Sequence, residues 1–379
     1  MGLKRRMKME KKAKRLVSLD VMRGLTVAMM ILVNNGYGES FAALQHSKWN
    51  GMTPCDLVFP FFLFIVGVST YLSLSKFSFR PSAQTLRKVF RRAALLFLVG
   101  LAIHWVDMAI DGRPLDFAHL RLWAVLQRIA LAYLFASLVA LYVNHRYLLP
   151  VIVGLLATYT VILIFGRGYA YDSSANILAQ VDLRLFGYDH LYHKSPVDPE
   201  GLLGTIPSVA HVLIGFYCAR LMKQADTLNQ KIIGFFVAGT VMVFAGYLLS
   251  YWLPLNKRIW SPTYVLATCG LAALLQGLLL YLIDGKTTAG RVLSPSSEGT
   301  GEVLLPFLVF GMNPLALYVL SELMAILFGH FGISTAIYGG IHTVVASPKW
   351  ASLCYALTFV ALNWLVGYVL YRRRIFIKL

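Results

Sequence analysis

Ten apolar segments, each long enough to cross a lipid bilayer as a helix, constrain this sequence more than any other feature. A helix needs about 20 mostly apolar residues to span the hydrocarbon core, where every backbone polar group must be satisfied internally. Hydrophobic residues make up 58% of the 379 residues and charged residues only 14%, so the chain is too apolar for a soluble protein of this size. We therefore predict an all-α, polytopic transmembrane helical bundle with about ten spans. The spans are expected at 18–36, 57–75, 89–106, 122–143, 148–166, 206–222, 232–253, 263–283, 304–328 and 352–371.

The Lys and Arg residues between the spans predict the orientation of the chain. Of the 35 basic residues, 24 lie in the segments on one side, which include both ends of the chain, and 9 lie on the other side. Since cytoplasmic segments carry the excess of Lys and Arg, we expect both termini in the cytoplasm. The same rule accounts for the formal charge of +18. We therefore expect the lipid bilayer, and no nucleic acid, as the partner of these charges.

This pattern divides the chain into two parts. Residues 1–15 are predicted to form a basic cytoplasmic N-terminal segment, and residues 16–379 a single transmembrane domain whose first span is not cleaved as a signal peptide. The four cysteines have no metal-ligand spacing, so we expect neither a bound metal nor a disulfide framework. They are Cys55, Cys218, Cys269 and Cys354.

Two polar groups lie inside spans near the cytoplasmic side. Asp20 and Arg23 are three residues apart, which places them on one face of a helix. They form either a structural ion pair at the membrane edge or part of a site for an anionic ligand. Asn313 precedes Pro314 inside the span 304–328, and Asn as a cap with Pro in the first turn is typical of a helix start. The alternatives are two half-helices with an anion site at the inner N-terminus, or a simple proline kink.

Other polar residues lie in the outer third of the spans. Gln127 and Arg128 open the fourth span, and an arginine at that depth needs a carboxylate or an anionic ligand beside it. Asp56, Glu322 or a substrate group are the candidates. For His211, a helix-packing hydrogen bond is favoured over a functional role.

Three residues with catalytic potential are tethered at the outer face. Asn34 ends the first span, Asp56 opens the second, and His46 lies in the loop between them. A histidine near a carboxylate can act as a general base or a nucleophile, and an asparagine can donate to an oxyanion. The alternative is a solvated loop histidine without a catalytic role.

Short segments spread along the chain carry a family resemblance. The segments are LVSLDVMRG at 16–24, Val33-Asn34, HSKWNG at 46–51, DLVFP at 56–60, VLQR at 125–128, DPEGLLGT at 198–205, Asn256-Lys257 with Trp260-Ser261, and Gly311-Met312-Asn313. In this order they resemble the heparan-α-glucosaminide N-acetyltransferase family, which comprises the lysosomal transmembrane enzyme and its bacterial relatives. The resemblance covers nearly the whole chain after the basic segment, without the luminal N-terminal domain of the lysosomal enzyme. We therefore expect a bacterial-type relative lacking that domain, in the inner (cytoplasmic) membrane.

The resemblance implies a reaction and its residues. Family members take acetyl from cytoplasmic acetyl-CoA and deliver it to an amino sugar across the membrane. His46 matches the active histidine, Asn34 the asparagine of the Val-Asn motif, and Asp56 the acid that opens the second conserved helix. The predicted donor-site residues are Asp20, Arg23, Asn313, Gln127 and Arg128. The predicted acceptor-site residues are Trp49, Asn50, Glu200, Lys257 and Trp260.

The sequence thus predicts a transmembrane, acetyl-CoA-dependent acyltransferase that acts on an extracytoplasmic amino sugar or glycan. His46 is either the general base or a nucleophile that carries the acetyl group, while Asn34 stabilises the oxyanion or orients His46 and Asp56 supports His46. The choice between N- and O-acetylation stays open, and the resemblance makes a homodimer plausible. The alternative function is a secondary transporter or flippase for a sugar or lipid-linked sugar, which would explain polar spans and a broken helix without any chemistry. A non-catalytic membrane scaffold explains these polar groups less well.

Overall fold

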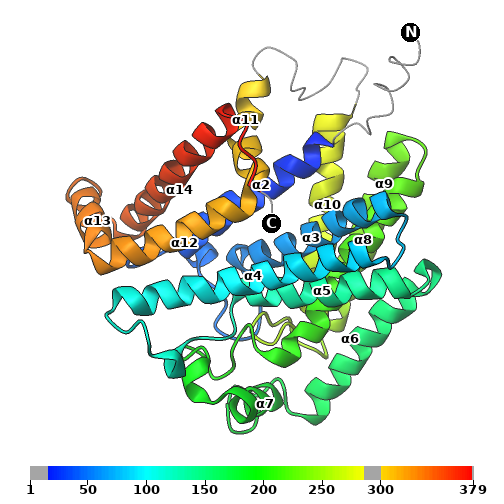
Figure 1. Ribbon diagram of the computed structural model, residues 1–379, viewed down its shortest axis with the longest axis horizontal. Helices are drawn as coiled ribbons and strands as arrows, with labels where there is room; N and C mark the ends of the chain where they lie inside the picture. The colour runs from blue at the N-terminus through cyan, green and yellow to red at the C-terminus, as the bar shows by residue number, and fades with distance from the viewer. Residues whose placement is uncertain (1–15, 286–299, 378–379) are drawn as a thin grey trace.

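The computed structural model describes residues 16–285 and 300–377, and within these ranges the chain is all-helical (Figure 1). The basic segment 1–15 lies outside the described residues. In the described part the only β pairing is an isolated bridge between Gly51 and Asn256. The helices are α2 Val17–Asn34, α3 Val58–Leu74, α4 Ala83–Ile110, α5 Val125–Tyr142, α6 Leu148–Phe165, α7 Ile177–Phe186, α8 Thr205–Gln224, α9 Leu228–Leu249, α10 Pro262–Leu279, α11 Thr300–Met312, α12 Pro314–His330, α13 Ile333–Val344 and α14 Pro348–Arg372.

The number of spans agrees with the sequence. Among the described residues, nine helices are long and apolar enough to cross a membrane, and the bent pair α11 and α12 makes ten when it is counted as one span. This confirms an all-α integral membrane bundle with about ten spans. Helices α7 and α13 were not predicted, and they lie in the two longest loops of the predicted outer side, 167–205 and 329–351.

The span predicted at 304–328 is broken at the predicted position. Helices α11 and α12 meet at 84° with Asn313 between them, which confirms two half-helices. The prediction that the Asn313 side chain caps α12 was wrong, because it makes no cap hydrogen bond. Its amide instead donates to the Ile375 carbonyl at 2.9 Å and accepts from the Ile377 backbone N–H at 2.8 Å. Asn313 therefore fastens the C-terminal tail to the break.

Helix α2 packs between two groups of helices. Figure 1 shows α11 to α14 gathered on one side of the bundle formed by α3 to α10, with α2 passing between them. The contacts are close because glycines face backbone: a Cβ at Gly24 of α2 would collide with the Phe307 carbonyl of α11. Likewise a Cβ at Gly67 of α3 would collide with the Val212 carbonyl of α8. Small residues allow such approach where lipid gives helices little hydrophobic reason to associate.

Candidate active site

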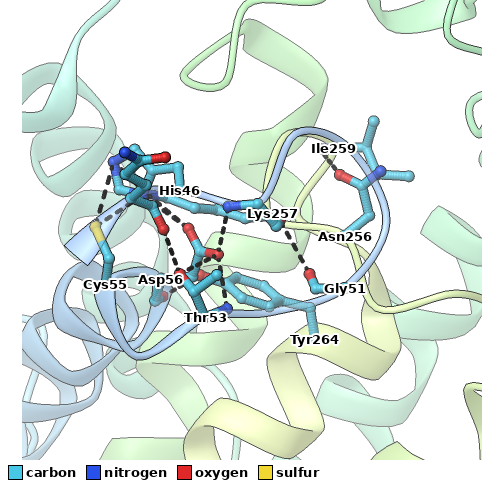
Figure 2. Close-up of polar contacts among 11 residues, drawn as sticks. His46, Gly51, Thr53, Cys55, Asp56, Asn256, Lys257, Ile259 and Tyr264 are labelled. Carbon is cyan, nitrogen blue, oxygen red and sulfur yellow. Dashed lines mark hydrogen bonds and ion pairs between the residues drawn. The ribbon is translucent and has the colours of Figure 1, made fainter. Parts of the chain in front are cut away.

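The loop between α2 and α3 brings His46 against Asp56. The His46 Nδ1 lies 2.8 Å from the Asp56 Oδ1, and the His46 side chain is 40% exposed whereas that of Asp56 is fully buried. A buried carboxylate beside an accessible imidazole fixes the ring orientation and favours the Nδ1–H tautomer, which leaves Nε2 as the reactive nitrogen. The structure thus brings these two predicted residues together (Figure 2).

Backbone groups hold the second oxygen of Asp56. The Oδ2 atom accepts from the Ser47 N–H at 3.1 Å, the Thr53 N–H at 3.0 Å and the Thr53 hydroxyl at 3.1 Å. Thr53 and Asp56 form a capping box at the turn Pro54–Leu57 that leads into α3. The Tyr264 hydroxyl of α10 donates to the Asp56 carbonyl at 2.5 Å. Asp56 is therefore an anchored acceptor that satisfies several buried donors at once.

Lys257 completes this cluster from the loop between α9 and α10. Its Nζ lies 2.9 Å from the His46 Nδ1, 3.1 Å from the His46 Nε2 and 3.5 Å from the Asp56 Oδ1. Burial lowers the pKa of Lys257, while the nearby Asp56 carboxylate raises it. The sequence predicted Lys257 as an acceptor-binding residue, and in the structure its Nζ contacts the His46 ring.

Asn34 lies apart from this cluster. Its amide donates to the Glu322 Oε1 of α12 at 3.2 Å, and within the described residues no hydrogen bond joins it to His46. Glu322, one of the expected partners of Arg128, is therefore the partner of Asn34 instead. The oxyanion role of Asn34 stays a prediction.

Three other predicted acceptor-site residues lie in or near the loops of the predicted outer side. The Trp49 Nε1 donates to the Tyr169 carbonyl at 3.0 Å, and the Asn50 Oδ1 accepts from the Asn256 amide at 3.2 Å. Glu200 accepts from the Arg121 guanidinium at 3.0 Å. Trp49 is half-buried and Asn50 is exposed, so Asn50 is the more accessible of these two side chains.

Arg128 and Trp260 lie behind the site in the helix core. Arg128 is 1% exposed and donates to the carbonyls of Gly201 at 2.8 Å and Gly204 at 3.2 Å. Its guanidinium also lies 5.5 Å from the ring centre of Trp260, which is 1% exposed. Backbone carbonyls are thus its direct partners, where the sequence predicted a carboxylate or a ligand. Both side chains support the loop before α8 and the loop before α10, and neither offers surface to a ligand.

Gln127, the residue that precedes Arg128 on α5, is also buried. A Cβ at Gly100 of α4 would collide with its amide, so the amide lies at a close contact between two helices. Gln127 and Arg128 do not line the basic cavity described next.

A cavity of about 1040 Å³ opens toward the other end of the bundle. Five basic residues line it, and none of its lining side chains in the described part of the chain is acidic. They are Arg23 of α2 and Arg87, Lys88, Arg91 and Arg92 of α4. Phe376 and Ile377 of the C-terminal tail, which Asn313 fastens, line it too. Its charge and size suit a large anionic ligand.

Asp20 and Arg23 form the predicted pair at this cavity. The Arg23 Nη1 lies 3.2 Å from the Asp20 Oδ1, and its Nη2 donates to the Ser69 hydroxyl of α3 at 3.1 Å. Arg23 lines the cavity, whereas its partner Asp20 is buried. The two predicted roles of this pair, a structural ion pair and part of an anion site, are therefore compatible with each other.

Several residues of the site escaped the sequence analysis. Thr53 with Asp56 has the spacing of a capping box, which was a readable signal. The α4 cations recur at intervals of four residues, Arg87 with Arg91 and Lys88 with Arg92, which places each pair on one helix face. The approach of Lys257 to His46 had no local signal, because 211 positions separate the two residues.

No group of three or more potential metal ligands occurs among the residues that the structure describes. The fold and the site together define an integral membrane protein that has a histidine–carboxylate cluster at one end and a basic cavity at the other.

Comparison with known proteins gives the family. A family model described as heparan-α-glucosaminide N-acetyltransferase, catalytic, matches residues 15–253. The heparan-α-glucosaminide N-acetyltransferase of Homo sapiens is 26% identical over 429 positions, covering 96% of this chain and 60% of the human protein. That of Mus musculus is 25% identical over 437 positions, covering 97% of this chain and 61% of the mouse protein. The chain therefore belongs to the heparan-α-glucosaminide N-acetyltransferase family, a family of transmembrane acetyltransferases, and it spans about 60% of the length of these relatives.

Proposed function

We propose that this chain transfers acetyl from acetyl-CoA, bound from the cytoplasmic side, to an amino sugar or glycan on the extracytoplasmic side. Residues 16–379 would act as one acyltransferase domain in the cytoplasmic membrane of a bacterium, with both termini in the cytoplasm. Family membership supports the acetyl transfer, and the excess of Lys and Arg supports the sidedness.

The observation that carries the proposal is that one helix connects the two sites. Residues of α3 from Ser73 to Phe62 line the basic cavity, which corresponds to about 16 Å along the helix axis. Asp56, in the turn that leads into α3, lies only about 9 Å further along the same direction. An acyl donor whose anionic nucleotide binds the α4 cations could thus extend its thioester along α3 toward His46. Acetyl-CoA has this form, with phosphates at one end and a thioester at the other.

The site supports two chemical routes. In one, the Nε2 of His46 takes a proton from the acceptor amine or hydroxyl as the acceptor attacks the thioester carbon. In the other, Nε2 attacks the thioester itself and passes the acetyl group on. Asp56 orients the ring and stabilises the imidazolium in both routes. We assign acetyl-CoA as a co-substrate, held by Arg23 and the α4 cations.

The test is a two-sided transfer assay in proteoliposomes. Labelled acetyl-CoA is supplied on one side of the membrane and glucosamine on the other, and the acetylated sugar is measured on the glucosamine side. The wild type should form product, and His46→Ala should lose about 1,000-fold or more in rate. His119→Ala is the matched control, because His119 contacts Asp116 at 2.6 Å in an exposed outer loop and should leave the rate unchanged.

The broken span favours a second candidate, a sugar transporter, because discontinuous helices often form transport sites. The same assay separates the two functions. If labelled glucosamine crosses the membrane without being acetylated, and His46→Ala does not change the rate of crossing, the result would contradict the acetyltransferase and favour the transporter.

A further inference from the structure

Lys257 occupies the space in which the reaction would develop charge. Its Nζ lies within 3.1 Å of both ring nitrogens of His46, and its side chain is 12% exposed. Figure 2 shows the Lys257 chain extending across the loops toward His46 and Asp56. Lys257 is therefore the cation closest to the reactive nitrogen in this cluster.

The loop that carries Lys257 is fixed to the loop that carries His46. The Gly51 N–H donates to the Leu255 carbonyl at 2.7 Å, and the Asn256 amide donates to the Asn50 side chain at 3.2 Å. Asn256 is fully buried, and its Oδ1 accepts from the Ile259 N–H at 3.2 Å. These bonds set the position of Lys257 before any substrate binds, which is how preorganised charge stabilises a transition state.

The hydrogen-bonding capacities of the three side chains assign the protons. The ammonium of Lys257 only donates and the carboxylate of Asp56 only accepts. When the His46 Nδ1–H donates to Asp56, Nε2 is the ring nitrogen that keeps a lone pair. The Lys257 Nζ lies 3.1 Å from Nε2 and 2.9 Å from Nδ1, so in the resting site Lys257 lies beside the ring and covers the nitrogen that either chemical route requires.

We infer that Lys257 is a catalytic residue, which covers the Nε2 of His46 at rest and turns to the acetyl oxygen as that oxygen becomes an oxyanion. This role rests on the proposed acetyl transfer. It gives Lys257 the oxyanion function that the sequence assigned to Asn34, whose amide is engaged by Glu322. The flexible four-carbon chain of lysine allows this short turn without movement of the loop.

The bonds and protons balance in the direct route. The acceptor nitrogen forms a bond to the thioester carbon, and the carbonyl electron pair moves to oxygen, where Lys257 donates to it. When the carbonyl reforms, the carbon–sulfur bond breaks and CoA leaves as the thiolate. The proton of the acceptor nitrogen passes to the Nε2 of His46 and then to the thiolate, which gives the amide and free CoA. In the acetyl-His46 route, Lys257 faces the same carbonyl oxygen in each of the two steps.

The charge on Lys257 sets the pH range of this role. The groups that act on it are Asp56, Cys55, Glu200 and Arg258, of which the first three raise the pKa of Lys257 and Arg258 lowers it. Burial is the largest cause and lowers the pKa, so Lys257 loses its charge at a lower pH than a free lysine. The transfer rate should therefore fall on the alkaline side as Lys257 becomes neutral.

The experiment compares Lys257→Met and Lys257→Arg in the detergent-solubilised, full-length protein. Lys257→Met should lower kcat for acetyl transfer from acetyl-CoA to glucosamine about 100-fold, with a small change in KM. Lys257→Arg should recover part of this loss and extend activity to higher pH, because arginine stays charged. Lys349→Met is the control, since Lys349 pairs with Glu39 at an exposed site at 3.3 Å.

A second readout does not depend on turnover. Diethyl pyrocarbonate modifies unprotonated imidazole nitrogens, and peptide mass spectrometry measures the modification of His46 by itself. Lys257→Met should uncover Nε2 and accelerate this modification, whereas Lys349→Met should not. Thermal unfolding of each variant shows whether it is folded. If Lys257→Met is unfolded, Lys257→Arg is compared with the wild type instead.

The outcomes separate this inference from the proposed function. Should the wild type transfer acetyl while Lys257→Met keeps its kcat and its alkaline limb, the inference is overturned and the proposed function stands. A wild type that transfers no acetyl overturns both. Unchanged modification of His46 in Lys257→Met contradicts the resting contact.

Discussion

At the end of α3 that we propose as the outer end, charged groups are paired within 3.5 Å, whereas at the proposed inner end four cationic side chains of α4 line an open cavity. Asp56 is fully buried and touches His46 at 2.8 Å and Lys257 at 3.5 Å. In contrast, Arg87, Lys88 and Arg91 are exposed. Paired, buried charges fix the positions of reacting groups, while exposed cations around a large cavity attract an anion from solution. The two ends of one helix are thus suited to chemistry and to binding, respectively.

The same distinction holds between two histidine–aspartate pairs on the outer loops. His119 and Asp116 are 2.6 Å apart, with side chains 53% and 27% exposed. Asp56 differs because it is fully buried and also accepts from two backbone N–H groups. Each carboxylate has a cation at 3.5 Å, but Lys257 beside Asp56 is 12% exposed whereas Arg113 beside Asp116 is 53% exposed. A short distance alone therefore does not distinguish the proposed catalytic pair from the exposed pair, whereas the burial of the carboxylate and its backbone donors do.

The largest effect is expected from Asp56→Asn. Asparagine keeps the size of the side chain but loses the negative charge, and its NH₂ group cannot accept from His46 or from a backbone N–H. We expect kcat to fall about 1,000-fold, because His46 loses its orienting acceptor and the stabilisation of its imidazolium. Initial rates at saturating acetyl-CoA and glucosamine measure this effect.

Asp116→Asn is the matched control for this comparison, since it alters the exposed pair in the same way. Its kcat should equal that of the wild type. Equal losses in the two variants would remove the distinction between the buried and the exposed pair.

A smaller effect is expected at the inner end, from Arg87→Gln combined with Arg91→Gln. These residues share one face of α4 at the cavity, so the double variant should raise KM for acetyl-CoA about tenfold, the loss of one charge-assisted contact. The kcat should change little, because the outer cluster is intact. With S-acetylpantetheine, which lacks the nucleotide, the double variant should match the wild type.

Arg146→Gln combined with Lys223→Gln is the control for charge at the same membrane side. Neither residue lines the cavity. An increase in KM as large as that of the α4 variant would show general attraction to a basic surface and would contradict a built donor site.

The sequence predicted the parts of the fold and site that depend on local patterns. The length of the apolar segments indicated about ten spans, and Asn313-Pro314 indicated the break between α11 and α12, and both were confirmed. The pairing of His46 with Asp56 was accessible for the same reason, since ten positions separate them.

Contacts between distant segments were not accessible. Lys257 meets His46 across 211 positions, and Asn34 meets Glu322 across 288, so no spacing rule connects them. Arg128 was expected to need a carboxylate, but the loop before α8 turns its carbonyls toward the guanidinium. Backbone acceptors leave no trace in a sequence, because every residue carries one.

The smallest effect is expected from Asn313→Ala, which tests whether the inner end is also shaped by fixed contacts. Asn313 holds the tail through Ile375 at 2.9 Å and Ile377 at 2.8 Å, and Ile377 lines the cavity. Loss of both bonds should free the tail and raise KM for acetyl-CoA about threefold, which corresponds to less than one ordinary hydrogen bond. The kcat should stay unchanged. Asn313→Asp keeps the acceptor for the Ile377 N–H and should give an intermediate KM.

Trypsin cleavage after Arg374 gives a second measurement of the same contact, because a freed tail is cut faster. Cleavage should accelerate in Asn313→Ala and should remain slow in Asn363→Ala, whose amide bonds within α14 to the Phe359 carbonyl. If the tail is cut faster while KM stays at the wild-type value, the tail is not part of the donor site. The α4 cations and Arg23 would then define the cavity without the tail, and the contacts of Arg23 with Asp20 and Ser69 would be the fixed polar contacts that shape the inner end.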